Sequence, residues 1–313
     1  MYQLVEELVL DAEKKQVPIS ELMVRQEMEK THRSREDIWE QMRKNYRVMK
    51  EAVEKGLTKD GVFSPTGLTG GEAVKLRNYR KKGTSLSGDD LLIAVESAIA
   101  TNEVNASLGI ICATPTAGSS GTLPGVMFGI KDKLALTEDQ MIQMLFCASG
   151  FGMVIANNAM ISGAAGGCQA EVGSASGMAA AAAVEIAGGT PNQCAEAMAM
   201  AISNLLGLVC DPVAGLVEIP CVKRNAIGAV NGLISADMAL AGLTNKIPAD
   251  DVIDALYRIG KSLPPSLRET GLGGLAATRE GVRLKMKIFG TELNVNEDEV
   301  SINENNKRKQ PEN

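Results

Sequence analysis

The sequence predicts a mainly helical protein. Apolar residues recur at helical spacing, helix-capping motifs stand before several of these runs, and alternating strand patterns are few. The chain has 313 residues, of which 45% are hydrophobic, so it can bury a large core. Its Gly- and Pro-rich stretches fall between the expected helices. We therefore expect a compact helical domain with irregular loops.

The first of three expected regions is a charged helical N-terminal region with a connector, residues 1–85. Ser34 and Asp37 form a capping box at the start of an amphipathic helix, and Gly56 suits its end. Residues 67–90 are basic and Gly-rich, which predicts a flexible connector. Asp89 and its acidic neighbour suit the first turn of the helix that follows.

The second region, residues 86–290, is predicted to be the helical main domain. Thr137 and Thr190 are each followed three residues later by glutamine, and Pro191 takes the favoured first helical position. No Lys or Arg occurs between residues 134 and 222, so these helices should be packed on most faces. The third region, residues 291–313, is polar and is expected to be a disordered tail.

Charge and hydropathy argue against two classes of partner. The formal net charge of −6 gives no reason to expect nucleic acid or an anionic membrane surface. The apolar run 141–167 is interrupted by Gln143, Asn157 and Asn158 and is rich in small residues, so we expect a buried helix pair rather than a membrane span. The N-terminus lacks the pattern of a secretory signal, which predicts a cytoplasmic location.

Five of the six cysteines fall into two groups. They are too sparse for a disulfide scaffold, and Cys147 and Cys194 stand in strong helical patterns where a thiol is usually a small core residue. Cys168, Cys210 and Cys221 instead lie in irregular contexts that contain Gly or Pro. Such loops can turn three thiolates toward one point.

Three thiolates suit zinc, copper(I) or an iron–sulfur cluster. A structural zinc site takes four ligands, often in C-x2-C pairs that are absent here, and His32, the one histidine, lies in the charged N-terminal region. A cluster with one open iron needs no fourth protein ligand. Spacing alone leaves both options open, so a zinc-stabilised scaffold is the non-enzymatic alternative.

Four stretches resemble a known family. "ATNEVNASLGIICATPTAGSSGTLPG", "ISGAAGGCQAEVGSASGMAAAA", "LLGLVCDPVAGLVEIPCVKRNA" and "LRETGLGGLA" are similar to the alpha chain of the two-chain, iron–sulfur-dependent L-serine dehydratases, from about Asn102 to Ala276. The resemblance implies a [4Fe-4S] cluster on Cys168, Cys210 and Cys221 and a largely helical catalytic domain built around that cluster.

The same resemblance implies an activity and a partner. The expected reaction is an L-serine ammonia-lyase reaction, L-serine to pyruvate and ammonia at the open iron, as in amino-acid degradation and gluconeogenesis. A separate beta chain is expected, and a higher oligomer is a further option. In single-chain relatives a C-terminal cysteine can occupy the open iron, whereas this sequence ends in KRKQPEN, so that form of autoinhibition is not expected.

The loop 114–125 offers hydroxyls and closely spaced N–H groups that could cradle a carboxylate, although a plain surface loop would look the same. The resemblance favours substrate binding, which we assign to four hydroxyl residues: Thr116, Ser119, Ser120 and Thr122. Asn102 and Asn105 are expected to orient either the substrate or the loop, with a helix-end role as the alternative.

Four charged residues complete the predicted site. Arg268 can clamp a carboxylate at two points. Arg224 is expected to balance the charge of the cluster and substrate, whereas Lys223 suits a solvated position. Asp211 should shape the turn after Cys210 by accepting backbone hydrogen bonds. Glu171 should lie next to the cysteines that bind the cluster, without binding the cluster itself.

The general base stays unassigned. The main domain has no histidine, so the base is a Lys or Glu with a shifted pKa, a deprotonated thiol or hydroxyl, or a group of the partner chain. A cysteine desulfidase using the same cluster is the alternative enzyme. Pyridoxal phosphate is not expected, because no lysine of the main domain stands beside a phosphate-binding loop.

Overall fold

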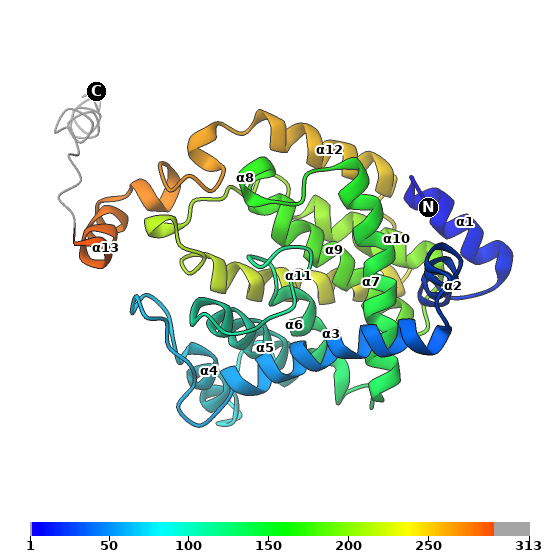
Figure 1. Ribbon diagram of the computed structural model, residues 1–313, viewed down its shortest axis with the longest axis horizontal. Coiled ribbons are helices and arrows are strands. Elements are labelled where there is room, and N and C mark those ends of the chain that lie inside the picture. Colours follow the sequence, from blue (N-terminus) through cyan, green and yellow to red (C-terminus); the bar gives the residue numbers. More distant parts are fainter. Residues whose placement is uncertain (1, 291–313) are drawn as a thin grey trace, which may run out of the picture.

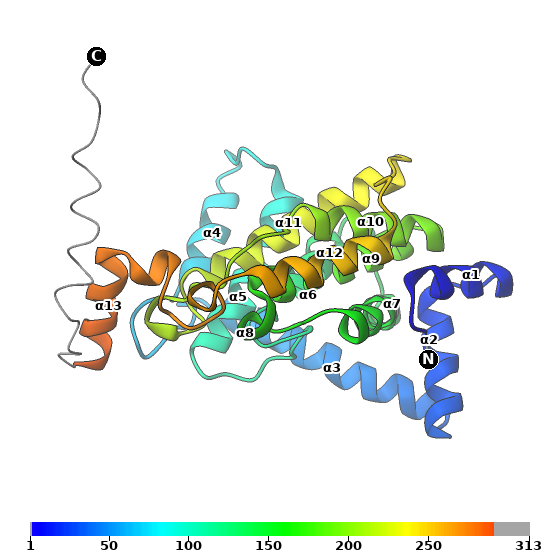
Figure 2. The ribbon, with the colours of Figure 1, turned by 90° about the horizontal axis from the view of Figure 1, so that it is seen from above.

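The computed structural model describes residues 2–290, and within them it contains thirteen α-helices and no strand beyond two isolated β-bridges. The predicted mainly helical class is therefore confirmed. The tail expected at 291–313 lies outside the described residues. Figures 1 and 2 show an elongated arrangement in which helices α1 and α2 lie at one end and α13 (Arg279–Phe289) at the other.

The centre of the molecule is α9 (Ser174–Ile186), a helix of small residues that is buried along most of its length. Small side chains let neighbouring helices approach closely: a Cβ on Gly177 would lie 2.9 Å from side-chain atoms of both Met198 and Ile202. Four helices surround α9, namely α6 (Thr122–Lys131), α7 (Glu138–Asn158), α10 (Pro191–Ser203) and α11 (Cys221–Leu240). The prediction that this part of the chain, which lacks Lys and Arg, is packed on most faces is confirmed.

The predicted helix starts are confirmed at all three positions. Ser34 accepts the N–H of Asp37 at the start of α3 (Arg35–Gly56). Thr137 and Thr190 each form a complete capping box with the glutamine three residues later. Each cap satisfies N–H groups that would otherwise lack a partner in the first turn, so the helix start is encoded within four residues.

The N-terminal helices pack on the main body. Helices α1 (Val5–Lys15) and α2 (Ile19–Thr31) contribute buried residues to the same hydrophobic core as α7 and α9. The half-buried Glu185 of α9 accepts the N–H of Ser20 at 3.2 Å at the start of α2. This bond joins the first turn of α2 to the central helix.

The connector is where the sequence prediction is wrong. Residues 67–90 include helix α4 (Glu72–Arg80), which packs on α5 (Asp89–Ala106). Glu103 of α5 accepts the N–H groups of Glu72 and Ala73 at 2.6 and 3.4 Å, and Arg80 pairs with the buried Glu96 at 2.9 Å. These partners are distant in sequence, so the Gly-rich composition conceals them. The expected acidic first turn of α5 is confirmed.

Burial of the Glu103 carboxyl at the start of α4 makes the free energy of unfolding of the protein depend on pH. Loss of hydration raises the pKa of Glu103 from 4.5 to about 7, although the two N–H groups it accepts lower it. Because the pKa is higher in the folded state, the contribution of Glu103 to stability is fully present below pH 4.5 and is lost as the pH rises through 7.

We expect Glu103→Gln, which keeps an acceptor oxygen but cannot ionise, to lose less stability than the native chain between pH 5 and pH 8. The difference should be on the order of 2–3 kcal/mol. Denaturant unfolding at the two pH values measures it, with the exposed Glu13→Gln as control. Equal losses in the native chain and in Glu103→Gln would contradict this account.

Helix α7 is, among residues 2–290, the one helix long and apolar enough to cross a membrane by length and composition alone. Within its most apolar stretch 61% of the residues are buried inside the protein, where α2 and α9 cover them. The packing is that of a core helix, as the sequence predicts for the first part of the run 141–167.

Candidate metal centre

Three thiols reach the candidate site from separate segments. Cys168 precedes the short π-helix η1 (Gln169–Gly173), which continues into α9; Cys210 lies in an irregular loop; Cys221 is the first residue of α11. All three are buried, with exposed fractions of 2%, 2% and 6%. Cys168 and Cys221 stand at the start of helical segments, where the helix dipole favours a thiolate.

A short extended pairing positions Cys210. Its N–H donates to the carbonyl of Leu267 at 2.9 Å, and its carbonyl accepts the N–H of Glu269 at 2.7 Å, so the two segments form a parallel β-bridge. The bridge brings Arg268 and Glu269, nearly sixty residues later in the chain, beside the thiols. The segment 265–277 thus forms one wall of the site.

The ligand atoms of Cys168, Cys210 and Glu171 lie within 4.8 Å of one another, the one such group of potential metal ligands among the described residues. Cys221 is not part of this group, but it lies close enough for the charges of Cys168 and Glu171 to affect its pKa. Burial raises the pKa of Cys221, and negative charge on Cys168 and Glu171 raises it further. Three buried sulfurs with a carboxylate beside them form a donor set that a multivalent cation would stabilise.

The thiols are electrostatically unequal. A hydrogen bond from Cys210 and the guanidinium of Arg224 hold the pKa of Cys168 below its ordinary value. The same hydrogen bond, together with burial, raises the pKa of Cys210 far above the ordinary thiol range. Without a cation, therefore, Cys168 is the thiol that ionises most readily, and metal binding would have to release protons from the other two.

Arg224 and Asp211 link the elements around the thiols. One guanidinium nitrogen of Arg224 lies 3.5 Å from Cys168 Sγ, 2.8 Å from the Val209 carbonyl and 2.8 Å from Asp211 Oδ1. Asp211 Oδ2 accepts the N–H of Leu275 at 2.7 Å. The predicted backbone bond to Asp211 is confirmed, although its donor comes from a distant loop rather than from the local turn.

Lys223 faces solvent and pairs with Glu72 at 2.8 Å, as predicted for the second basic residue of this pair. The two neighbours therefore differ sharply: the Arg224 side chain is 17% exposed and that of Lys223 is 64% exposed.

The hydroxyls of the loop 114–122 mostly hold the loop itself. Ser119 donates to the carbonyl of Thr114 at 3.0 Å, and Thr122 donates to Asn225 Oδ1 at 3.0 Å. Ser119, Ser120 and Thr122 are fully buried. A substrate-binding role for these three stays a prediction. The bonds of Ser119 lie within the loop and those of Thr122 join it to α11, whereas the buried Ser120 hydroxyl has no hydrogen-bond partner among the described residues.

Thr116 is the loop hydroxyl that reaches the thiol site, because it donates to Glu171 Oε1 at 2.7 Å. Two asparagines of α5 contact the loop. Asn105 donates to the carbonyl of Ala117 at 3.3 Å. The fully buried Asn102 packs so closely against Gly121 that a Cβ on that glycine would lie 2.2 Å from Asn102 Nδ2. Of the three roles considered for the two asparagines, these contacts favour orienting the loop.

Sequence reasoning missed three residues of the site. Glu269 and Asn225 directly follow two residues that it singled out, Arg268 and Arg224, and adjacency was the one available signal. The third, Glu218, is buried just before Cys221. Its carboxylate accepts hydrogen bonds at 2.9 Å from three hydroxyls of the turn 63–71, those of Ser64, Thr66 and Thr69. These bonds join that turn to the segment before Cys221. Nothing local in the sequence marks this contact.

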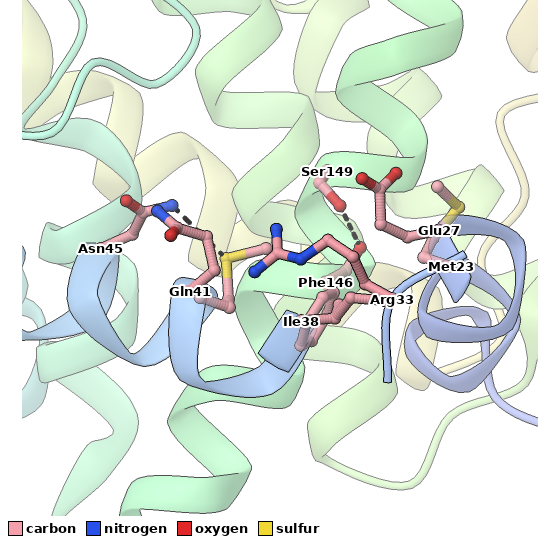
Figure 3. A pocket seen from close by; sticks show the side chains of 9 residues that line it. Met23, Glu27, Arg33, Ile38, Gln41, Asn45, Phe146 and Ser149 are labelled. Atoms are coloured by element: carbon pink, nitrogen blue, oxygen red, sulfur yellow. Dashed lines mark hydrogen bonds between the residues drawn. The ribbon is translucent and has the colours of Figure 1, made fainter. Parts of the chain in front are cut away.

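A cavity of about 160 Å³ lies elsewhere, between α2, α3 and α7 (Figure 3). Arg33 and Glu27 stand on its walls, with Phe146 beside them. None of the residues that line it belongs to the thiol site. The predicted core thiols Cys147 and Cys194 are fully buried in the hydrophobic core, which confirms that prediction.

Comparison with known proteins matches residues 14–276 to the family model described as the serine dehydratase alpha chain. A probable L-serine dehydratase alpha chain of Bacillus subtilis (strain 168) is 63% identical over 293 residues, covering 94% of this chain and 97% of that protein. The L-serine dehydratase alpha chain of Peptoniphilus asaccharolyticus is 42% identical over 269 residues, covering 86% of this chain and 92% of that protein.

A longer relative shows the same likeness. L-serine dehydratase TdcG of Escherichia coli (strain K12) is 36% identical over 263 residues, which are 82% of this chain but 58% of that protein. The family match begins at residue 14, so the likeness extends beyond residues 102–276 into the N-terminal helices. The chain therefore belongs to the L-serine dehydratase alpha-chain family, as its sequence motifs predicted.

Proposed function

We propose that this chain, together with a beta chain, converts L-serine to pyruvate and ammonia at a [4Fe-4S] cluster held by Cys168, Cys210 and Cys221. One observation carries the proposal: in a member of this family, three cysteines from separate segments are buried around one site. Two observations support a partner chain. Relatives of similar length are named alpha chains, and the TdcG relative is longer, with 58% of its length matched by this chain.

The residues present fit such a cluster. The donor set is rich in sulfur, which suits iron–sulfur chemistry, and Gly163 leaves open a point 2.8 Å from Cys210 Sγ that a Cβ would fill. When bound, the cluster supplies a Lewis-acidic iron that polarises the C–O bond of serine, an effect worth several kcal/mol. Arg224 offsets the negative charge of the thiolates, and its bonds to Val209 and Asp211 fix the loop that carries Cys210.

Arg268 is the candidate for binding the substrate carboxylate. The β-bridge holds it next to Cys210, and its Nε is buried without a hydrogen-bond partner among the described residues. A buried unpaired donor is costly, and a carboxylate would satisfy it. The single histidine, His32, ends α2 near the opposite end of the molecule from α13 (Figure 1), so it is not a candidate base for this site. The general base stays unassigned between a residue of this chain and a group of the beta chain.

The test is anaerobic co-purification with the beta chain, followed by analysis of iron and labile sulfide and by turnover of L-serine and L-cysteine. We expect about four irons per alpha chain, brown colour and faster turnover of L-serine. Full activity without iron would contradict the proposal. Preference for L-cysteine with release of sulfide would favour a desulfidase, and one zinc without iron would favour a scaffold role. A cytoplasmic location stays a prediction.

A further inference from the structure

Two carboxylates face one point of the thiol site. Glu171 Oε2 and Glu269 Oε2 would lie 2.7 and 3.1 Å from a Cβ on Gly163, and Cys210 Sγ would lie 2.8 Å from it. Because residue 163 is glycine, no side chain there separates the three groups. Glu171 is 6% exposed, so water offsets little of its charge.

No cationic side chain of the described residues pairs with either carboxylate. Glu171 accepts the Thr116 hydroxyl at 2.7 Å and a backbone N–H of Gly163, and the carboxylate of Glu269 makes no hydrogen bond or ion pair in residues 2–290. Arg224 is already engaged by Cys168 and Asp211. Two like charges beside a thiol site are unfavourable unless a cation joins them.

The backbone holds Glu269 in place at a conformational cost. Its φ of 62° lies in the left-handed region, which non-glycine residues seldom adopt. The bond from its N–H to the Cys210 carbonyl, at 2.7 Å, fixes this conformation. The side chain is therefore presented beside Cys210 by the same bridge that places Arg268.

We propose that Glu171 and Glu269 bind the α-ammonium group of the substrate and so restrict the site to amino acids. This inference rests on the proposed function. An ammonium group brings three N–H donors and one positive charge, which match two converging carboxylates that no cationic side chain of the described residues neutralises. Arg268, next to Glu269 in the chain, brings the opposite charge for the substrate carboxylate. A 2-hydroxy acid would leave the two glutamates without a cation.

The test uses the two-chain holoenzyme prepared without oxygen. Glu269→Gln should raise the KM for L-serine roughly tenfold or more with a smaller change in kcat, because a charge-assisted hydrogen bond is lost. The discriminating measurement is calorimetric binding of L-alanine and L-lactate, which differ in the amino and hydroxyl groups. The preference for L-alanine over L-lactate should fall by a similar factor in Glu269→Gln and in Glu171→Gln, and Glu269→Asp should restore part of it.

Iron content and thermal unfolding accompany each variant, with the exposed Glu280→Gln as matched control. Variants that keep their iron but no longer prefer L-alanine over L-lactate would support the assignment of the two glutamates to the substrate ammonium group. An equal loss of affinity for both ligands, an unchanged preference, or loss of iron in Glu171→Gln would overturn it, the last because Glu171 would then be a metal ligand. Wild-type enzyme that lacks iron or does not turn over L-serine would instead contradict the proposed function.

Discussion

Cys210→Ala is expected to abolish iron binding and to lower L-serine turnover by about 10³-fold or more, the scale of Lewis-acid assistance. The thiol is buried beside Cys168, and we expect no other thiol to replace it, because Cys147 and Cys194 lie in the hydrophobic core and Cys112 packs against that core. Iron analysis and turnover of the anaerobic two-chain enzyme measure both effects.

Cys147→Ala is the matched control for that variant. It removes an equally buried thiol, so it should cost some stability through the small cavity it leaves, but it should keep both iron and activity. If Cys210→Ala retained iron, or if Cys147→Ala lost it to the same extent, the assignment of the metal ligands would be wrong.

Arg224→Met should destabilise the chain by about 3–5 kcal/mol, because it leaves the buried Asp211 carboxylate without its charge partner. It should also weaken iron retention, since the loop that carries Cys210 loses its link to α11. Denaturant unfolding of the alpha chain measures the first effect, and iron analysis after gel filtration measures the second.

The adjacent Lys223→Met provides the comparison, because Lys223 makes one exposed ion pair with Glu72. Its effect on stability should stay below about 1 kcal/mol, with iron unchanged. Similar effects of the two substitutions would mean that the ion pair of Arg224 with Asp211 has no special role.

The fold was predictable where its signals are local. A helix cap involves residues three apart, so Ser34, Thr137 and Thr190 could be identified without knowledge of their surroundings. Helix α4 was missed because its stability depends on Glu103 and Glu96, residues of another helix that a local pattern does not reveal. The glycine content of residues 67–90 predicted a flexible segment, whereas hydrogen bonds and an ion pair to α5 hold α4 in place.

The candidate site divides in the same way. The three cysteines stood out through their Gly- and Pro-containing contexts and through a family resemblance. The structure brings Cys168 and Cys210 together, with Cys221 buried close enough for the charge of Cys168 to raise its pKa. Glu269 could not be selected from the sequence, because its relation to Glu171 arises from the β-bridge between Cys210 and Arg268. Hydroxyl content predicted substrate binding by Ser119 and Thr122, which stays a prediction, whereas the bond of Ser119 to the Thr114 carbonyl and that of Thr122 to Asn225 of α11 could not be read from the sequence.

The most direct test of the central claim is Mössbauer spectroscopy of the two-chain enzyme enriched in ⁵⁷Fe, with and without L-serine. Three protein thiolates around a four-iron cluster leave one iron without a cysteine ligand. We therefore expect the signal of about one iron in four to change on addition of L-serine, while the other three stay the same. A spectrum that does not respond to L-serine in an enzyme that turns it over would contradict the account.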